Sequence, residues 1–197
     1  MDFYNSNAEN LFHKYQQVDP EKVHGSWLNH LPVKSGLALD VGGGSGRDAV
    51  WLAQKGWNVI VVEPALALRE LGEKFSAGYS TIWLDDRLPD LIQLQTYRQQ
   101  FVLILVSGVF MHLPYQQRVD SLDTLVELLV KNGLLIITLR KGPDTDRREL
   151  YNVDAEEIKV LAEKKFLKVE VTDILEDELK RANVTWQTVI IHNRVNE

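Results

Sequence analysis

Residues 37–47, LALDVGGGSGR, decide the fold. Four apolar residues around one acid lead into a turn with four glycines, and a helix-forming segment begins at Arg47. Glycine lacks a Cβ and adopts positive φ without strain, so a ligand can approach the backbone of such a turn closely. The stretch therefore predicts a strand, a ligand-binding loop and a helix in succession. The residues leave one alternative open, a tight turn whose neighbouring acids only cap helices.

Outward from this stretch, short apolar runs alternate with segments of helical periodicity, the pattern of a parallel sheet with crossover helices. We expect strands over residues 37–41, 57–62, 79–84, 101–106, 134–139, 167–173 and 184–192. We expect helices over 5–18, 20–30, 47–55, 65–75 and 154–165, and a long one from Pro114 to Asn132 whose apolar stripe includes Leu129 and Val130. The last two strands follow each other without a long crossover, which favours an antiparallel pair at one edge. The sum is a doubly wound α/β sheet of seven strands, mostly parallel with an antiparallel last strand and preceded by N-terminal helices.

The composition is that of one folded domain. The 197 residues carry 22 basic and 28 acidic side chains, a net charge of −6, and 45% of them are apolar. We expect a single domain over 1–197, with 1–35 as a helical segment that covers the ligand-binding edge. Because the chain has no cysteine, disulfides, thiolate metal sites and cysteine nucleophiles are excluded. The spacing of carboxylates and imidazoles suggests no metal site.

The same composition narrows location and partners. No apolar run approaches the roughly 20 residues that a membrane-spanning helix needs, and the first eight residues are not a basic segment followed by an apolar one. We therefore expect a cytoplasmic protein without a membrane segment. The acidic balance disfavours nucleic acid, whose phosphates it repels. The oligomeric state stays open.

Polar residues end the first four predicted strands, namely Asp40, Glu63, Asp85 and Ser107. In an open parallel sheet, ligands bind beyond these ends, where the connections diverge. Gly44, Gly46 and Ala49 satisfy the G-x-G-x-x-G/A fingerprint of dinucleotide binding, so an NAD(P)-binding oxidoreductase is one interpretation. Against it, Arg47 stands where a match that begins at Gly42 requires its third glycine.

The order of these features resembles class I S-adenosylmethionine-dependent methyltransferases. Residues 40–46 are similar to their D-x-G-x-G-x-G signature, and residues 107–114, SGVFMHLP, to the segment that lines their cofactor and acceptor pockets. The resemblance extends over residues 5–139. It implies a Rossmann-like sheet and S-adenosylmethionine (SAM) as the cofactor, with Asp40 at its ammonium group, Glu63 at both ribose hydroxyls and Asp85 at the adenine amino group. The cofactor-binding residues implied are Asp40, Gly42, Gly44, Gly46, Arg47, Glu63, Asp85, Asp86 and Ser107.

The acceptor side carries fewer signals. An unperturbed imidazole has a pKa of about 6.5, so His112 is a candidate general base, and fixing its own loop by hydrogen bonds is the alternative. The N-terminal helix either closes over the cofactor with Phe12 or Tyr15 or only packs on the sheet. The candidates for contact with the acceptor are Tyr15, His112, Arg140 and Tyr151.

A basic cluster follows the fifth predicted strand. Arg140, Lys141, Arg147 and Arg148 would suit an anionic acceptor, unless Asp144, Asp146 and Glu149 neutralise them. Because the core fold accounts for almost all of the chain, we expect transfer to an oxygen or nitrogen of a small molecule rather than of a macromolecule. A non-catalytic module that only binds SAM is the remaining alternative.

Overall fold

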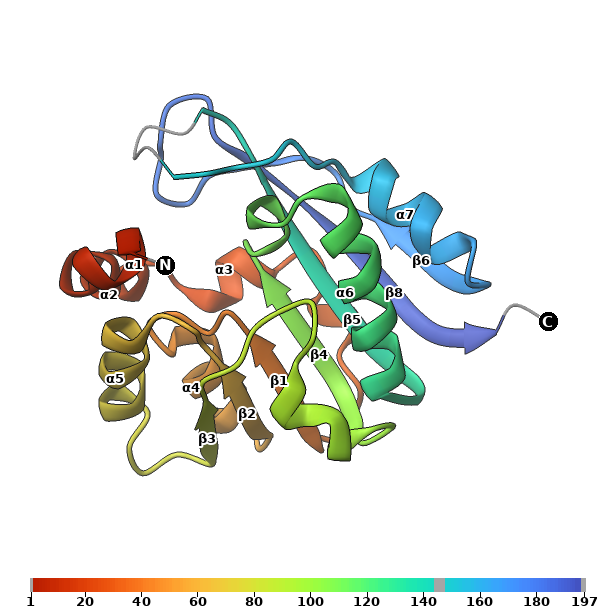
Figure 1. Cartoon of the computed structure of the whole chain (residues 1–197), viewed down its shortest axis with the longest axis horizontal. Coiled ribbons are helices and arrows are strands. Elements are labelled where there is room, and N and C mark those ends of the chain that lie inside the picture. The colour runs from red at the N-terminus through yellow and green to blue at the C-terminus, as the bar shows by residue number, and fades with distance from the viewer. Residues whose placement is uncertain (1, 144–147, 196–197) are drawn as a thin grey trace.

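The computed structural model describes residues 2–143 and 148–195. One sheet runs through the molecule in the order β3-β2-β1-β4-β5-β8-β6, with the short β7 paired to β8 (Figure 1). The strands are β1 (Leu37–Val41), β2 (Asn58–Val62), β3 (Thr81–Leu84), β4 (Phe101–Ser107), β5 (Leu129–Lys141), β6 (Leu167–Val171), β7 (Leu175–Glu176) and β8 (Thr185–Val195). β1 to β5 are parallel, and β8 runs antiparallel to β5 and β6. The predicted α/β sheet is confirmed, with the two-residue β7 as an addition.

Helices cover both faces of this sheet. α4 (Arg47–Gln54) packs with Trp27 on one face, and η2 (Ile92–Tyr97), α6 (Tyr115–Leu128) and α7 (Ala155–Glu163) pack on the other. In β4, Leu103 belongs to the core on the α4 side of the sheet, and Ile104 belongs to the core on the α6 side. A central strand that is buried on both sides is apolar without alternation. In the described part of the chain, no helix combines the length and the apolar character needed to cross a membrane.

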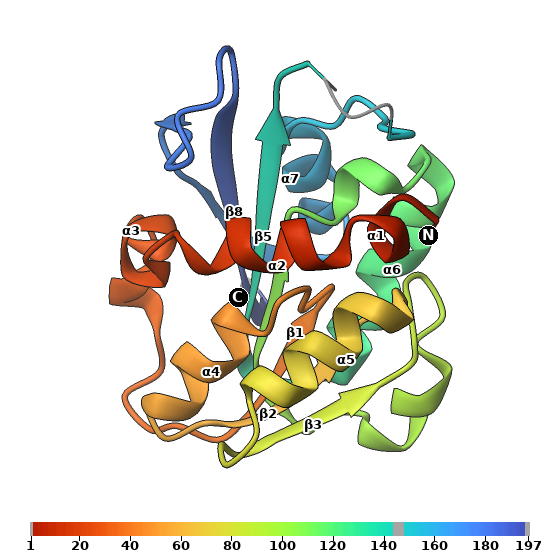
Figure 2. The same ribbon diagram turned by 90° about the vertical axis from the view of Figure 1, so that its left-hand side faces the viewer.

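The N-terminal segment consists of α1 (Asp2–Ser6), α2 (Ala8–Gln16), α3 (Pro20–His24) and the 3-10 turn η1 (Leu28–His30). Figure 2 shows α1 and α2 lying nearly end to end beside α5 (Leu66–Phe75). Leu11 of α2 packs against Leu68 of α5 in a small core of their own. Asp19 caps the start of α3, because its carboxylate accepts a hydrogen bond from the N–H of Glu21 at 2.9 Å.

Three predicted helices differ from the structure. The segment 5–18 is divided between α1 and α2 at Asn7, and 20–30 is divided between α3 and η1. The long helix ends at Leu128, so the assignment of Leu129 and Val130 to its stripe was wrong; both begin β5. Leu129 is extended, with φ −73° and ψ 140°, and pairs with Phe101 of β4. An apolar stripe cannot mark this boundary, because a residue at the entry of a central strand is as apolar as one on the helix face.

Candidate functional site

A cavity of about 950 Å³ opens at the carboxyl ends of the central strands. The chain leaves β1 towards β2 on one side, while β4 lies on the other. Such a switch point is where open α/β sheets bind ligands. Among the described residues, its wall includes residues 41–45, Glu63, Ser107, Thr138, and Tyr4 and Tyr15 of the N-terminal helices.

The glycine loop between β1 and α4 presents backbone to this cavity. Gly42, Gly44 and Gly46 have φ of 72°, 55° and 78°, a region that favours glycine. The N–H of Gly42 donates to the carbonyl of Val62 at 2.7 Å, which ties the loop to the end of β2. A Cβ added to Gly44 would find its nearest atoms 3.8 Å away, on Gly42 and Tyr15. The space above Gly44 is therefore open to a ligand, whereas Gly46 lies off the cavity wall at the start of α4.

Asp40 lies beneath the loop rather than on the cavity wall. Its side chain is buried, and among the described residues its Oδ2 has no hydrogen-bond partner. Burial raises the pKa of its carboxyl well above the usual value, the neighbouring Asp48 raises it further, and Arg47 opposes both. Burial of an ionisable carboxyl without a hydrogen-bond partner lowers the stability of the fold, and acids with strongly shifted pKa values cluster at functional sites.

Glu63 joins the loop to the segment that enters α5. Its carboxylate accepts from the N–H of Gly44 at 2.9 Å and from the N–H of Ala65 at 2.8 Å. Burial raises its pKa, although these two hydrogen bonds lower it in part. Each carboxylate oxygen can accept more than one hydrogen bond. Glu63 lines the cavity and can therefore still accept from hydroxyl groups of a ligand.

The two acids after β3 lie elsewhere. Asp85 is exposed and pairs with Nη1 of Arg69 at 3.2 Å. The carboxylate of Asp86 accepts from the N–H groups of Arg87 and Gln93 at 2.8 and 2.7 Å, so it shapes its own loop. Neither is among the described residues that line the cavity. The expectation that both face the cofactor is therefore not matched by their positions, and the chain presents residues 87–90 to the cavity instead.

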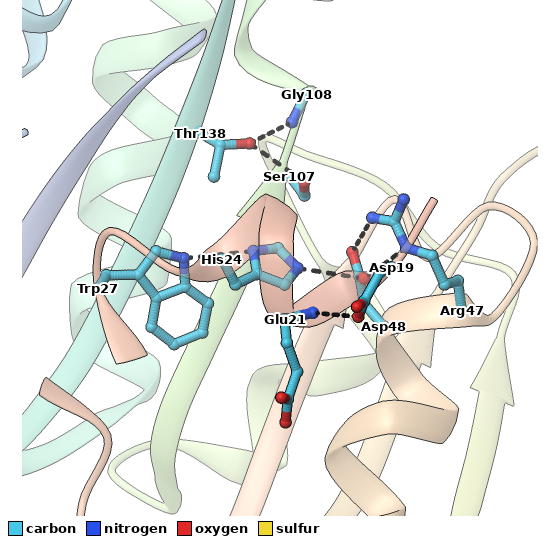
Figure 3. A network of polar contacts seen from close by, with 9 residues as sticks. All are labelled: Asp19, Glu21, His24, Trp27, Arg47, Asp48, Ser107, Gly108 and Thr138. Carbon is cyan, nitrogen blue, oxygen red and sulfur yellow. Dashed lines mark hydrogen bonds and ion pairs between the residues drawn. The ribbon is translucent and has the colours of Figure 1, made fainter. Parts of the chain in front are cut away.

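A chain of polar contacts holds Arg47 at the cavity (Figure 3). Its Nε and Nη2 donate to the carboxylate of Asp48 at 2.8 and 2.9 Å. Nε2 of the buried His24 lies 3.1 Å from the same carboxylate, and Nδ1 of His24 accepts from Nε1 of Trp27 at 3.2 Å. Burial alone would raise the pKa of Asp48, but Arg47 and then His24 outweigh it, and the pKa is lowered. The N-terminal segment is thereby coupled to the first turn of α4.

Ser107, at the end of β4, lies on the cavity wall. Its Oγ is 3.1 Å from Oγ1 of Thr138 in β5, and the N–H of Gly108 donates to the same Oγ1 at 3.2 Å (Figure 3). These bonds fix the backbone where β4 leaves the sheet.

His112 and Tyr4 meet at another part of the wall. His112 ends the short turn η3 (Phe110–His112), and its Nε2 lies 2.8 Å from the hydroxyl oxygen of Tyr4 in α1. Both residues line the cavity, as does Tyr15, whose pKa burial raises. The sequence reasoning missed Tyr4, because an aromatic residue in so short a helix carries no periodic signal. Phe12, its other aromatic candidate, packs against Phe75 of α5.

Of the remaining candidates for contact with the acceptor, Arg140 lines the cavity and Tyr151 does not. Arg140 is buried, lines the cavity and donates to the carbonyls of Gly142 and Pro143 at 3.2 and 2.8 Å. Tyr151 is not among the described lining residues, and its hydroxyl donates to Glu149 at 2.8 Å on the surface. Arg148 lines the cavity with Glu149. Of the predicted basic cluster and its acids, Arg147, Asp144 and Asp146 lie outside the described residues.

A further group on the wall comes from the segment before β8. The buried carboxylate of Asp177 accepts from Arg181 at 2.6 Å and from Nε1 of Trp186 at 2.7 Å. Burial favours a higher pKa, but these hydrogen bonds lower the pKa of Asp177 to about 2. The sequence gives no signal for this group, because its members meet only when the segment folds back on β8.

The sequence matches the family model described as a methyltransferase domain over residues 13–189. A search of curated protein sequences found no match.

Similar solved structures have the same fold. Phosphoethanolamine N-methyltransferase 2 of Haemonchus contortus, solved with S-adenosylhomocysteine (SAH) and phosphomonomethylethanolamine, has a TM-score of 0.77 at 13% identity, covering 98% of this chain. This chain spans only 59% of that protein's length. The 1,6-didemethyltoxoflavin-N1-methyltransferase of Burkholderia thailandensis has a TM-score of 0.70 at 16% identity, covering 97% of this chain and 87% of its own. Magnesium protoporphyrin IX methyltransferase of Synechocystis, solved with bound SAM, has a TM-score of 0.66 at 14% identity, and the match covers 96% of this chain and 83% of that protein.

Proposed function

The chain belongs to the methyltransferase-domain family, and from this premise we propose that it is an enzyme that uses SAM to methylate an oxygen or nitrogen of a small molecule. One observation carries the proposal. The cavity at the switch point is lined both by the open backbone at Gly44 with Glu63 and by the Tyr4–His112 pair. A cofactor site and an acceptor site thus share one space.

The residues present fit SAM. Gly44 leaves room where any other residue would carry a Cβ, and Glu63 offers carboxylate oxygens to a ribose diol. The buried acid Asp40, beneath the loop, favours a ligand that carries positive charge. Arg47, held by Asp48, suits the carboxylate of the methionine portion. SAM supplies a methyl group on a cationic sulfonium centre.

At the acceptor end, we assign proton transfer to His112. Its imidazole can take the proton that an oxygen or nitrogen loses on methylation, and a base with a pKa near ambient pH is suited to this. Tyr4 orients the ring through the 2.8 Å hydrogen bond to Nε2 and closes α1 over the site. Positioning and exclusion of water are the main requirements of methyl transfer.

Arg140, Arg148 and Arg181 also line the cavity, but so do Glu149 and Asp177, so the charges of the wall favour no single acceptor charge. A small molecule rather than nucleic acid, and a cytoplasmic location, stay predictions from length and composition. So does the single domain over 1–197.

Calorimetric titration of the full chain with SAH tests the cofactor assignment. Gly44→Ala places a methyl group in the open space, and overfilling of this kind costs about 1–3 kcal/mol, roughly a 5- to 150-fold loss of affinity. Gly78→Ala is the matched control. Gly78 also has positive φ, 91°, in an exposed turn with no atom within 4 Å of a Cβ, so it shares the backbone strain and should leave binding unchanged.

Three results would contradict the proposal. Equal SAH affinity in Gly44→Ala and Gly78→Ala would remove the site. Binding of NAD(P) but not of SAH would favour the oxidoreductase. Tight SAH binding without transfer of a labelled methyl group to any pool of small molecules would favour the non-catalytic module.

A further inference from the structure

Three side chains that are far apart in the sequence meet on the face of the sheet that η1 covers. His30 ends η1, Glu170 lies in β6 and His192 lies in β8. Lys168 pairs with His192 and Glu170 with Ile190 across the antiparallel strands. Glu170 and His192 are therefore diagonal neighbours on one face. None of the three lines the cavity described above.

Their polar atoms converge. Oε2 of Glu170 lies 4.0 Å from Nε2 of His30, and Oε1 of Glu170 lies 3.6 Å from Nε2 of His192. One such atom from each residue lies within 4.8 Å of the other two. Nε2 of His192 is buried and has no hydrogen-bond partner among the described residues. Buried polar atoms in folded proteins are nearly always satisfied, so this nitrogen marks the cluster as a place for a ligand.

We propose that His30, Glu170 and His192 bind a divalent transition-metal ion of the zinc class. Two imidazole nitrogens and one carboxylate oxygen are ligands that such ions prefer, with bonds of about 2.0–2.2 Å. A tetrahedral ion with these bonds holds its ligand atoms about 3.4 Å apart. The carboxylate oxygens of Glu170 lie 3.6 and 4.0 Å from the two imidazole nitrogens, and the three ligand atoms lie within 4.8 Å of one another. Rotation of the side chains must therefore bring them closer together when the ion binds. The side chains are 24%, 41% and 18% exposed, so water completes the coordination.

Lys168 sets the affinity of this site. Its ammonium lies 3.1 Å from Oε1 of Glu170 and occupies the carboxylate in the absence of a metal. A metal ion must displace it, so removal of the lysine charge strengthens metal binding. If the three side chains form only an ion-pair cluster that binds no metal, removal of the Lys168 charge creates no measurable zinc affinity. The Lys168 variant therefore distinguishes the two explanations.

Metal at this position would join two parts of the fold. η1 belongs to the N-terminal segment, its residue Leu28 packs against the core on the α4 side of the sheet, and β6 is the edge strand of the sheet. A shared ion clips the N-terminal segment to that edge. Zinc is therefore expected to raise the midpoint of thermal unfolding.

The test is calorimetric titration of chelator-treated full-length chain with zinc chloride, followed by cobalt(II) titration with visible absorption as a second readout. We expect one zinc ion per chain. His30→Ala and His192→Ala should each weaken binding by about tenfold or more, and Lys168→Met should strengthen it. His13→Ala is the matched control, because His13 is an exposed histidine 4.0 Å from Glu9 and outside the cluster.

Each outcome decides the proposal. Absence of zinc binding, unchanged affinity in both His30→Ala and His192→Ala, or weaker binding in Lys168→Met would overturn it. Circular dichroism checks that each variant folds. Should His192→Ala fail to fold, His30→Ala in the partly exposed η1 and the isosteric Glu170→Gln carry the test. The absence of a zinc-dependent rise in the unfolding midpoint in the unaltered chain would also overturn it.

Discussion

Replacing Asp40 by asparagine is expected to stabilise the ligand-free protein at neutral pH. The carboxyl of Asp40 is buried, and its pKa is raised. The native state thus holds this proton more tightly than the unfolded chain does. The stabilisation from Asp40 is complete below its unfolded-state pKa of about 3.9 and is lost as pH rises through the higher native pKa. Asparagine keeps the shape without the charge and avoids this loss.

The size of the gain follows from the charge that asparagine lacks. A buried polar atom without a partner costs about 1–3 kcal/mol when it is neutral and more when it is charged. Asparagine keeps a polar atom where Oδ2 of Asp40 has no partner among the described residues, but it carries no charge, so we expect a gain of about 1–3 kcal/mol. Urea unfolding, followed by tryptophan fluorescence, should give a gain of this size at about pH 8 and a smaller one at about pH 5. Asp173→Asn removes an equal charge from an exposed position and should change stability by less than about 0.5 kcal/mol.

A gain of equal size at both pH values, or a less stable Asp40→Asn at the higher pH, would refute this reasoning. The same variant should bind SAH more weakly, because the side chain beneath the loop can then no longer ionise beside the ammonium group of the ligand. Stability and affinity would move in opposite directions, as is common when a strained site serves function.

Three further predictions concern the cavity and its support. Glu63→Gln turns an amide NH2 towards the N–H of Gly44 or Ala65. It should therefore lower the free energy of unfolding in urea by about 1–3 kcal/mol and weaken SAH binding in calorimetry. Equal stability and equal SAH affinity in the variant and the unaltered protein would contradict the role of Glu63. Tyr4→Phe removes a hydrogen bond worth about 0.5–1.5 kcal/mol, so amide exchange in α1 should quicken by roughly two- to tenfold, whereas the surface control Tyr79→Phe should leave it unchanged. Gly72→Ala places a Cβ against the ring of Trp83 and should lower the free energy of unfolding by about 1–3 kcal/mol; an unchanged urea midpoint would show that the ring can move aside.

The segment from β1 to the start of α4 could be predicted closely because its signals are local. The strand over residues 37–41 and the helix start at Arg47 follow from an apolar run, a glycine turn and a change of period within a few residues. The helix end at Leu128 could not be predicted, because no glycine or proline marks it and the apolar run continues into β5.

The site shows the same limit. Glu63 and Ser107 line the cavity as expected from strand ends, which parallel pairing brings to one edge. Asp85 and Asp86 follow a strand end too, but Asp85 pairs with Arg69 and Asp86 accepts from the N–H of Gln93, and neither lines the cavity. Tyr4 and the cluster at His30 depend on contacts between segments distant in the sequence, and spacing along one segment carries no information on those.

β8 follows every other strand along the chain, yet it lies inside the sheet, between β5 and β6. During translation, β5 therefore leaves the ribosome with one edge unpaired while residues 142–184 are still being added, and β6 reaches the sheet only through β8. Open edges of this kind recruit strands from other chains. A nascent chain arrested before residue 185 would expose the whole outer edge of β5, so ribosome stalling over 142–184 should yield aggregates rather than a shortened folded protein.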